Sequence, residues 1–413
     1  KPSLHVTATH TLWITKADPP PPAMRPCLIS SLALLAAPAA SLQVASSANS
    51  SANSSVGCEP FYLWPSARGR VGTYSHAPFV GVPEVASKLS WKWQHPAGRF
   101  NTVTLGTLLD DLANVYLAAD DGIRKFDKDG HLLWTYTPKA KARIPTSPSL
   151  MMGNLYGSST DGRIFRLSMQ TGRQMWQTKV SSAIAEDVGS VSAYGDMIVV
   201  ASDMKDGANR KVRCLRGRDG SRIWSFTPDA PVWNFQANFV HSHIPRKQFV
   251  IFQDIEGRVY KLGLQYGKLA WKSGGVPGTA TDGAALLGEN NVVYAVSLHG
   301  NKFTNVTVDT PGNVTAYAIN GTRLWSRSVP RPPSALPAVG KLFPGTHSGF
   351  SVVVPVGRQC ARGQSDVYAF DAATGQPQWK WEGPVNMADS CAGDREGFAT
   401  RTSLGIRRAC MPA

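Results

Sequence analysis

Short runs of apolar and β-branched residues recur along most of the chain, and polar turn residues separate them. The runs at residues 115–117, 198–200, 249–252, 292–294 and 352–354 are rich in Val, Ile, Phe and Tyr, which favour strands. Most are followed by Gly or by an Asp-Gly or Glu-Gly pair, which forms a tight turn. Because no segment has a helical period long enough to alternate with these strands, the pattern predicts an all-β protein.

A glycine stands four residues before a tryptophan six times, which marks an internal repeat. Chance would produce this spacing for about one of the 12 tryptophans, given 38 Gly in 413 residues. The steps between these tryptophans are 42, 48, 47, 54 and 54 residues. A four-stranded propeller blade has ~40 to 50 residues. The six pairs are Gly130/Trp134, Gly172/Trp176, Gly220/Trp224, Gly267/Trp271, Gly321/Trp325 and Gly375/Trp379.

Each glycine fits the turn of a β-hairpin, because Gly adopts positive φ without strain. The third residue after the glycine is mostly apolar, so we expect that face of the strand to be buried and the tryptophan face to be only partly buried. A large side chain on that face can cover the seam between neighbouring blades. We therefore assign a blade-packing role to Trp91, Trp134, Trp176, Trp224, Trp271, Trp325 and Trp379.

The repeats predict a β-propeller of four-stranded blades, with six complete blades and part of a seventh. Residues 87–93 resemble the last strand of a blade whose other strands do not precede it, so we expect a C-terminally truncated chain; an eighth blade is left open. The predicted parts are an unstructured leader (1–23), a signal peptide (24–40), a Ser/Asn-rich linker and lead-in (41–84), the propeller (85–381) and an irregular C-terminal extension (382–413).

Residues 368–379, Tyr-Ala-Phe-Asp-Ala-Ala-Thr-Gly-Gln-Pro-Gln-Trp, resemble the pyrroloquinoline quinone (PQQ) repeat, and residues 88–381 resemble the PQQ-like repeat propellers as a whole. This quinoprotein alcohol dehydrogenase-like superfamily includes dehydrogenases, in which the quinone lies over the centre of the ring with calcium and a catalytic Asp. It also includes non-enzymatic BamB-like members. The chain has no adjacent pair of cysteines, and no motif places calcium ligands or a catalytic Asp.

The N-terminal region has the pattern of an export signal. Met24-Arg25 opens an apolar stretch over residues 27–37, and Ala37-Pro38-Ala39 offers a cleavage site. This stretch is too short to span a membrane, which takes ~20 residues, and no other apolar run is long enough. We therefore expect a protein secreted or delivered to the endomembrane lumen; organelle import through a bipartite leader is the less favoured alternative.

Sequons and cysteines are compatible with export. Three Asn-x-Ser/Thr sequons, at Asn305, Asn313 and Asn320, crowd into the enlarged fifth repeat and are candidate glycosylation sites; ordinary polar turn residues are the alternative. Five cysteines follow the signal segment. Among them Cys391 and Cys410 form a candidate loop-closing disulfide.

Charge and motifs narrow the range of functions. The 43 Lys and Arg exceed the 28 Asp and Glu, but the basic clusters fall in inter-strand positions, so we expect a solvated surface and no nucleic acid. Nucleophile-elbow, zinc-helix and P-loop motifs are absent from the sequence. His241 and His243 lie near Trp233, Asn234 and Phe235, and these five form a candidate pocket; a metal site is the weaker interpretation because a third ligand is missing.

Taken together, these features predict a non-enzymatic secreted or lumenal propeller that acts as a binding scaffold. We expect a monomer without cofactors or metals and with a protein or glycan partner. The alternative is a PQQ-dependent dehydrogenase that uses calcium and oxidises alcohols or sugars.

Overall fold

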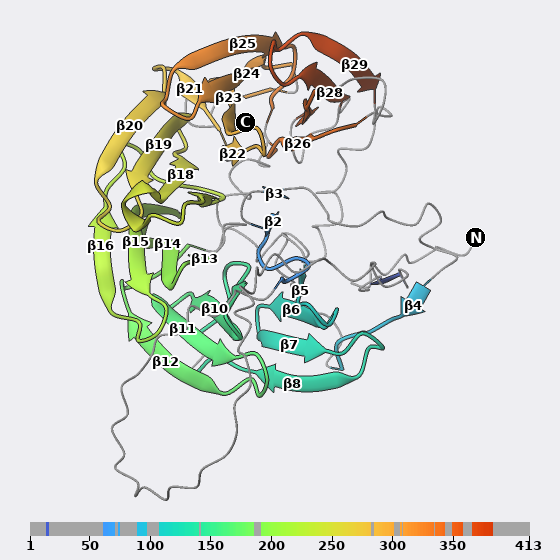
Figure 1. The fold of residues 1–413 in the computed structure, drawn as a ribbon, viewed down its shortest axis with the longest axis vertical. Helices are drawn as coiled ribbons and strands as arrows, with labels where there is room; N and C mark the ends of the chain where they lie inside the picture. Colours follow the sequence, from blue (N-terminus) through green and yellow to red (C-terminus); the bar gives the residue numbers. More distant parts are fainter. Residues whose placement is uncertain are drawn as a thin grey trace, which may run out of the picture.

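Successive antiparallel sheets of the chain stand side by side in an arc, which confirms the predicted all-β propeller (Figure 1). The computed structural model describes residues 14–15, 61–70, 73–74, 89–96, 107–139, 142–185, 191–281, 285–300, 306–307, 309–333, 335–342, 349–357 and 366–382. Among these residues no helix is long and apolar enough to cross a membrane. The described residues form six blades, numbered here in chain order.

The blades have the following strands. Blade 1 contains β5 (Leu108–Leu109), β6 (Val115–Ala119), β7 (Gly122–Phe126) and β8 (Leu132–Tyr136), and blade 2 contains β9 (Ser149–Met151), β10 (Asn154–Ser159), β11 (Arg163–Ser168) and β12 (Gln174–Lys179). Blade 3 contains β13 (Ser192–Tyr194), β14 (Met197–Lys205), β15 (Ala208–Arg216) and β16 (Arg222–Phe226), and blade 4 contains β17 (Asn238–Val240), β18 (Phe249–Gln253), β19 (Arg258–Gly263) and β20 (Leu269–Gly274). Blade 5 contains β21 (Thr279–Ala280), β22 (Leu286–Leu287), β23 (Val292–His299), β24 (Gly312–Ala318) and β25 (Arg323–Val329), and blade 6 contains β26 (Ala338–Gly340), β27 (Ser351–Val356), β28 (Asp366–Asp371) and β29 (Pro377–Glu382).

Neighbouring strands pair in sequence order in every blade, with the shortest strand innermost. Blade 5 differs because its innermost position is divided: β21 and β22 both pair with β23. The hydrophobic core lies mainly between blades, since clusters of buried residues join blade 1 to 2, blade 2 to 3, blade 3 to 4, and blades 4, 5 and 6. Each blade is therefore stabilised by its neighbours.

The outermost strand of every blade carries a β-bulge directly after the glycine turn. In blade 1, Phe126 pairs with Leu132 and Lys125 pairs with Trp134, so Leu133 is an extra residue. The same shift occurs at the equivalent residue of the other five blades. A bulge rotates the strand beyond it, and here the tryptophan turns toward the next blade.

The bulge makes one sequence-based expectation wrong. The third residue after the glycine was expected to face the core, but Leu133 is 51% exposed and Leu324 is 49% exposed. The tryptophan face is the more buried one, since Trp224 and Trp325 are each 7% exposed. Counting by strict alternation fails here because the extra residue shifts every later position to the other face.

The repeated tryptophans of blades 1 to 5 each lie against the glycine turn of the following blade. A Cβ atom added to Gly267 would come within 2.6 Å of the Trp224 ring, and one added to Gly375 would come equally close to Trp325. The indole Nε1 of Trp224 also donates to the carbonyl of Leu264 at 2.7 Å. The same pair of contacts joins Trp91, Trp134, Trp176, Trp271 and Trp325 to the blade that follows each of them.

The two ends of the arc differ at this contact. Strand β4 (Leu89–Trp91) brings Trp91 onto the Gly130 turn of blade 1, as the last strand of a preceding blade would. In blade 6 the Trp379 Nε1 atom is buried, and no residue of the described structure accepts its proton. At the start of the arc, Trp91 therefore has its hydrogen-bond acceptor in blade 1. At the end of the arc, the Trp379 indole has no acceptor among the described residues.

Two segments outside the repeats also have structure. Within the predicted leader 1–23, β1 (Ile14–Thr15) pairs with β4. Residues 61–70, which no pattern predicted, lie along the innermost strands of blades 1 and 2. Trp64 exchanges backbone hydrogen bonds with Leu109, and the buried Tyr62 joins the core between these blades.

Candidate binding surfaces

Of the residues of the predicted pocket, Phe235 is buried in the core, and His241 and His243 lie against each other. Phe235 is 1% exposed and packs against Phe252 in the core, with ring centroids 5.6 Å apart, so it lines no open cavity. His241 accepts or donates a hydrogen bond at 2.6 Å with the Tyr194 hydroxyl, and its ring meets that of His243 edge-on at 5.0 Å. Trp233 is half-buried, and Asn234 adopts a positive φ of 46°.

The described residues contain no cluster of side chains that could hold a metal ion. No three His, Cys, Asp or Glu side chains in the described part of the chain come together as ligands would. Asn305, Cys391 and Cys410 lie outside the described residues. Cys214, in β15, is a free thiol, and burial raises its pKa well above the usual range.

The inside of the arc is partly filled by residues 61–70, together with β2 (Gly69–Arg70) and β3 (Thr73–Tyr74) (Figure 1). The Leu150 N–H donates to the carbonyl of Pro65 at 2.7 Å, and the Gly153 N–H donates to the Tyr62 hydroxyl at 2.7 Å. A quinone held over the centre of a propeller needs open space beside the inner strands. In this chain a backbone segment lies beside the inner strands of blades 1 and 2.

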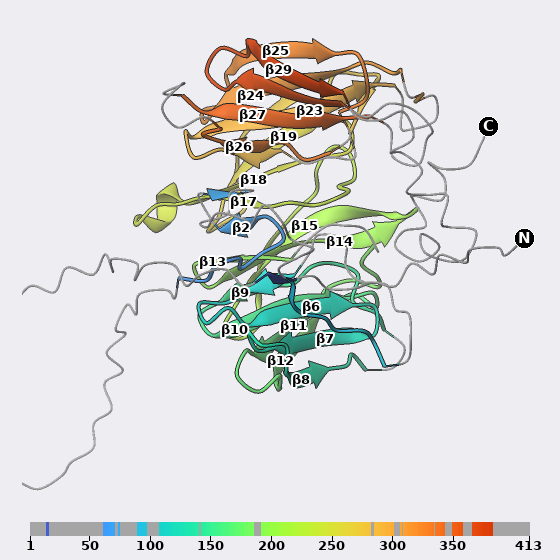
Figure 2. The same ribbon diagram turned by 90° about the vertical axis from the view of Figure 1, so that its right-hand side faces the viewer.

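The turns of each blade lie on two opposite rims. Because the strands are antiparallel, turns between the first and second strands and between the third and fourth strands share one side, which we call the first rim. The other turns, including the connections between blades, form the second rim. In Figure 2 the short 3-10 helix η2 (Pro245–Lys247) projects from the first rim, and the β14–β15 hairpin extends on the other side.

Large apolar side chains are exposed at equivalent turns of the first rim. Leu112 is 70% exposed between β5 and β6, and Tyr266 is 74% exposed between β19 and β20. Turns between first and second strands also expose Met152, Ile244 and Leu342. Isolated exposed apolar residues are ordinary, but exposed apolar residues recur at the turn between the first and second strands in blades 1, 2, 4 and 6.

Two of these turns hold a residue in a strained backbone conformation. Met152 has a φ of 47°, and Ala113, next to Leu112, has a φ of 59°. A bulky residue adopts the left-handed region at a free-energy cost of about 1–2 kcal/mol. The strain presents the exposed side chains at the tips of these turns.

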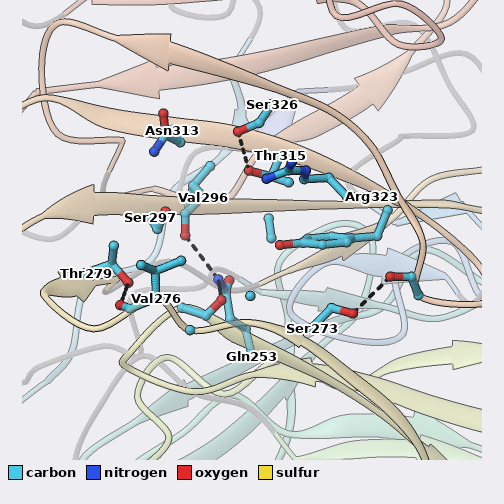
Figure 3. Close-up of a pocket in the computed structure, with 16 residues that line it drawn as sticks. Gln253, Ser273, Val276, Thr279, Val296, Ser297, Asn313, Thr315, Arg323 and Ser326 are labelled. Atoms are coloured by element: carbon cyan, nitrogen blue, oxygen red, sulfur yellow. Dashed lines mark hydrogen bonds between the residues drawn. The ribbon is translucent and has the colours of Figure 1, made fainter.

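A cavity of about 410 Å³ with both polar and apolar lining residues lies at the seam between blades 4 and 5 (Figure 3). Its walls come from β18, the β18–β19 turn and β20 on one side and from β23, β24 and β25 on the other. Side chains that line it include Gln253, Ser273, Thr279, Asn313, Thr315 and Tyr317. Residues far apart in sequence form this cavity, and the sequence analysis did not find it; the enlarged fifth repeat and the Gly274-Gly275 pair are the only signals.

A network of charges supports the wall of this cavity at the β18–β19 turn. The buried Asp254 carboxylate accepts hydrogen bonds from the Tyr260 hydroxyl at 2.7 Å and from the Arg258 N–H at 2.9 Å. Burial raises the pKa of Asp254 despite these bonds. Arg258 also contacts Asp229 at 3.1 Å, and a hydrogen bond from Lys272 lowers the pKa of Asp229.

The two described sequons differ in surroundings. Asn313 lies within β24, lines the cavity and hydrogen-bonds to His299 at 2.8 Å. Asn320 is exposed in the β24–β25 turn, where its Oδ1 accepts the Thr322 N–H at 3.1 Å. A glycan at Asn313 would occupy the cavity, whereas one at Asn320 would extend into solvent.

Part of the basic surface is neutralised locally. In the β14–β15 hairpin, Lys211 lies 3.0 Å and Arg213 lies 3.5 Å from the carboxylate of Asp203. At the β6–β7 turn, Arg124 and His95 both contact Asp121. In these two places a carboxylate therefore neutralises part of the positive charge of the surface.

The antiparallel blades, their tryptophan seams and their two rims define a propeller of PQQ-like repeats. A family model described as "Outer membrane protein assembly factor BamB" matches residues 119–381, and the chain belongs to this family. It is 23% identical over 268 residues to the outer membrane protein assembly factor BamB of Burkholderia pseudomallei, which covers 64% of this chain and 62% of that protein. The chain thus spans less than two thirds of this relative.

Three solved structures are similar to part of this chain. BamB from Moraxella catarrhalis gives a TM-score of 0.47 at 14% identity, covering 66% of this chain and 74% of that one. A europium-containing methanol dehydrogenase gives 0.39 at 13% identity, covering 68% and 78%. The quinohemoprotein alcohol dehydrogenase from Comamonas testosteroni gives 0.38 at 12% identity, covering 68% and 67%.

Proposed function

We propose that this protein is a non-enzymatic propeller scaffold whose first rim binds a protein partner outside the cytoplasm. The recurrence of exposed apolar side chains at equivalent first-rim turns carries this proposal. Burying one Leu, Met or Ile side chain contributes about 1.5–3 kcal/mol, so three or four such contacts supply a useful part of the free energy of binding.

Three further features support a binding role. The strained turns at Ala113 and Met152 hold apolar tips away from the blade, and backbone strain of this kind clusters at functional sites. The tryptophan seams fix the blades relative to one another, so the tips keep their spacing. The family description names an outer membrane protein assembly factor, and by analogy we infer that the partner is a protein.

Export, glycosylation at Asn320 and the monomeric state remain parts of this proposal. The apolar segment over residues 27–37 and its cleavage pattern support secretion or delivery to a lumen. The exposed position of Asn320 supports it as a glycan acceptor if the compartment glycosylates proteins.

Site-specific photo-crosslinking tests the partner surface. A photoreactive amino acid at position 112 or 342 of the first rim should give one discrete protein adduct in cells that make the protein. The matched control is position 276 on the second rim, where Val276 is 65% exposed. Equal adducts from both rims, or none from the first rim, would contradict the proposed surface.

Addition of PQQ and calcium tests the enzymatic alternative. The scaffold proposal predicts no change in the visible spectrum of the quinone and no dye reduction with alcohols or aldoses. A saturable spectral shift together with substrate-dependent dye reduction would overturn it.

A further inference from the structure

We propose that the cavity between blades 4 and 5 binds a neutral polyhydroxylated ligand of the size of a mono- or disaccharide. The cavity of about 410 Å³ is within the ~300–1,000 Å³ range of small-molecule sites. It lies at the seam of two blades and includes none of the exposed apolar residues of the first rim, so this inference stands independently of the proposed partner surface.

An unpaired buried acceptor gives the first argument. Gln253 lines the cavity and is 2% exposed. Its Nε2 donates to the carbonyls of Gly257 and Val296, both at 3.1 Å, as Figure 3 shows for Val296. Reversing the amide would lose both bonds, so its orientation is fixed and Oε1 is the atom without a partner. A buried unpaired acceptor costs about 1–3 kcal/mol, which a ligand hydroxyl would recover.

Hydroxyl groups on both walls of the cavity give the second argument. The Thr315 and Ser326 hydroxyls bond to each other at 2.9 Å, and the Ser273 hydroxyl donates to the Gly321 carbonyl at 2.9 Å. Each of these oxygens keeps lone pairs that can accept a further hydrogen bond. The Tyr317 hydroxyl adds a donor, and it borders the cavity beside Gly274, where an added Cβ would lie 2.9 Å from the phenolic oxygen.

The balance of charge selects the class of ligand. The described lining residues include no Asp, Glu, Lys or His, and Arg323, at an exposed position, is the sole ionised side chain among them. Phosphate or carboxylate ligands are usually held by several cationic or convergent N–H groups. A wall of hydroxyl, amide and carbonyl groups instead matches the alternating donors and acceptors of a sugar, and the ring of Tyr317 adds apolar contact.

Binding of simple sugars tests the inference. Saturation-transfer NMR and calorimetry would use glucose, N-acetylglucosamine and maltose, with glucose 6-phosphate as the charged analogue. We expect at least one neutral sugar to bind with a dissociation constant in the millimolar range or tighter, and glucose 6-phosphate to bind more weakly than glucose.

Two variants locate the binding. Gln253→Leu removes the unpaired acceptor, and Tyr317→Phe removes one hydroxyl while keeping the ring. Each should weaken sugar binding about 3- to 10-fold, as the loss of one hydrogen bond predicts. The control is Tyr136→Phe, which removes a hydroxyl that bonds to Gln174 at the seam of blades 1 and 2, and it should bind the sugar like the wild type. Tyr317→Phe keeps the test decisive if Gln253→Leu does not fold.

Three outcomes would overturn the inference. One is the absence of binding by every neutral sugar at about 20 mM, well above a millimolar dissociation constant, which would mean that water alone fills the cavity. Another is tighter binding of the phosphorylated sugar than of glucose. The third is binding that neither Tyr317→Phe nor Gln253→Leu reduces in protein whose circular dichroism shows it to be folded.

Discussion

At the scale of single residues, the seam between blades depends on a glycine that has two separate requirements. Gly267 has a φ of 66°, which an L-residue adopts only with strain, and its Cα faces the Trp224 ring. A side chain would add both backbone strain and a clash with the indole. The seam glycines therefore differ from glycines that occupy turns with open space around them.

Gly267→Ala should lower the free energy of unfolding by about 2–4 kcal/mol, since it combines strain with overpacking. Gly195→Ala is the matched control, because Gly195 also has positive φ, 56°, but an added Cβ would meet nothing within 4 Å. The control should cost only about 1 kcal/mol. Urea denaturation of both variants measures the difference, and equal midpoints would show that the indole contact is unimportant.

A second prediction at this scale concerns pH. The hydrogen bond from Lys272 lowers the pKa of Asp229 below its unfolded value, so the ionised group stabilises the native state above the unfolded pKa of about 4. This contribution is lost as pH falls through the folded pKa. Because the Asp229 side chain is 42% exposed, Asp229→Asn should cost only about 0.5 kcal/mol at pH 7. The difference from wild type should shrink below pH ~4; an equal difference at pH 7 and pH 3 would contradict this assignment.

At the scale of elements, one bulge per blade sets the direction of the outer strand. The extra residue lies outside the pairing register and is exposed in blades 1, 2, 4 and 5, and the following tryptophan turns to the next blade. Six copies of this bulge, one in each blade of the described structure, make it part of the repeat.

Leu133→Lys should change the free energy of unfolding by less than about 0.5 kcal/mol, as an exposed position allows. Leu167→Lys is the comparison, because Leu167 is fully buried in β11 and a lysine there would bury an unpaired charge. We expect that variant to lose at least about 4 kcal/mol or to fail to fold. If Leu133→Lys lowered the free energy of unfolding by more than about 2 kcal/mol, Leu133 would face the core, as simple alternation predicts.

The sequence predicted the repeated hairpins, but it did not predict the bulge in each outer strand or the cavity between blades 4 and 5. The Gly-x-x-x-Trp spacing located the hairpins because turn and seam impose fixed residue types at fixed intervals. The bulge was missed because Leu133 and Met175 are apolar although exposed, so hydrophobicity alone gave the wrong face. The cavity around Gln253 was missed because tertiary packing brings its strands together, and no local pattern records that contact.

At the scale of the whole molecule, the blades form a chain of nearest-neighbour contacts. Each described seam repeats one ring-on-glycine contact and one indole hydrogen bond, from Trp91 to Trp325. Stability in such an array is approximately a sum over units and interfaces. The contribution of a tryptophan to stability then depends on whether the next blade supplies a hydrogen-bond acceptor for its indole N–H.

Trp224→Phe should therefore be more destabilising than Trp379→Phe by at least about 1 kcal/mol. The first substitution loses the hydrogen bond to Leu264, whereas the second removes a buried N–H that no described residue accepts. Parallel urea titrations measure the two free energies of unfolding. Equal losses would indicate that Trp379 has an acceptor in solution.

The contact between Tyr62 and Gly153 joins positions 91 residues apart, across the whole of blade 1. At a synthesis rate of about 5–20 residues per second, the segment around Tyr62 emerges roughly 5–20 s before the strand that covers it exists. During that interval blade 1 can form its own hairpins and pair its inner strand with Trp64, but Tyr62 and Pro65 still lack their partners in blade 2. Blade 1, although it is synthesised first, therefore completes its packing only after blade 2 has been synthesised. A slow step in the synthesis of blade 2 would delay the folding of both blades.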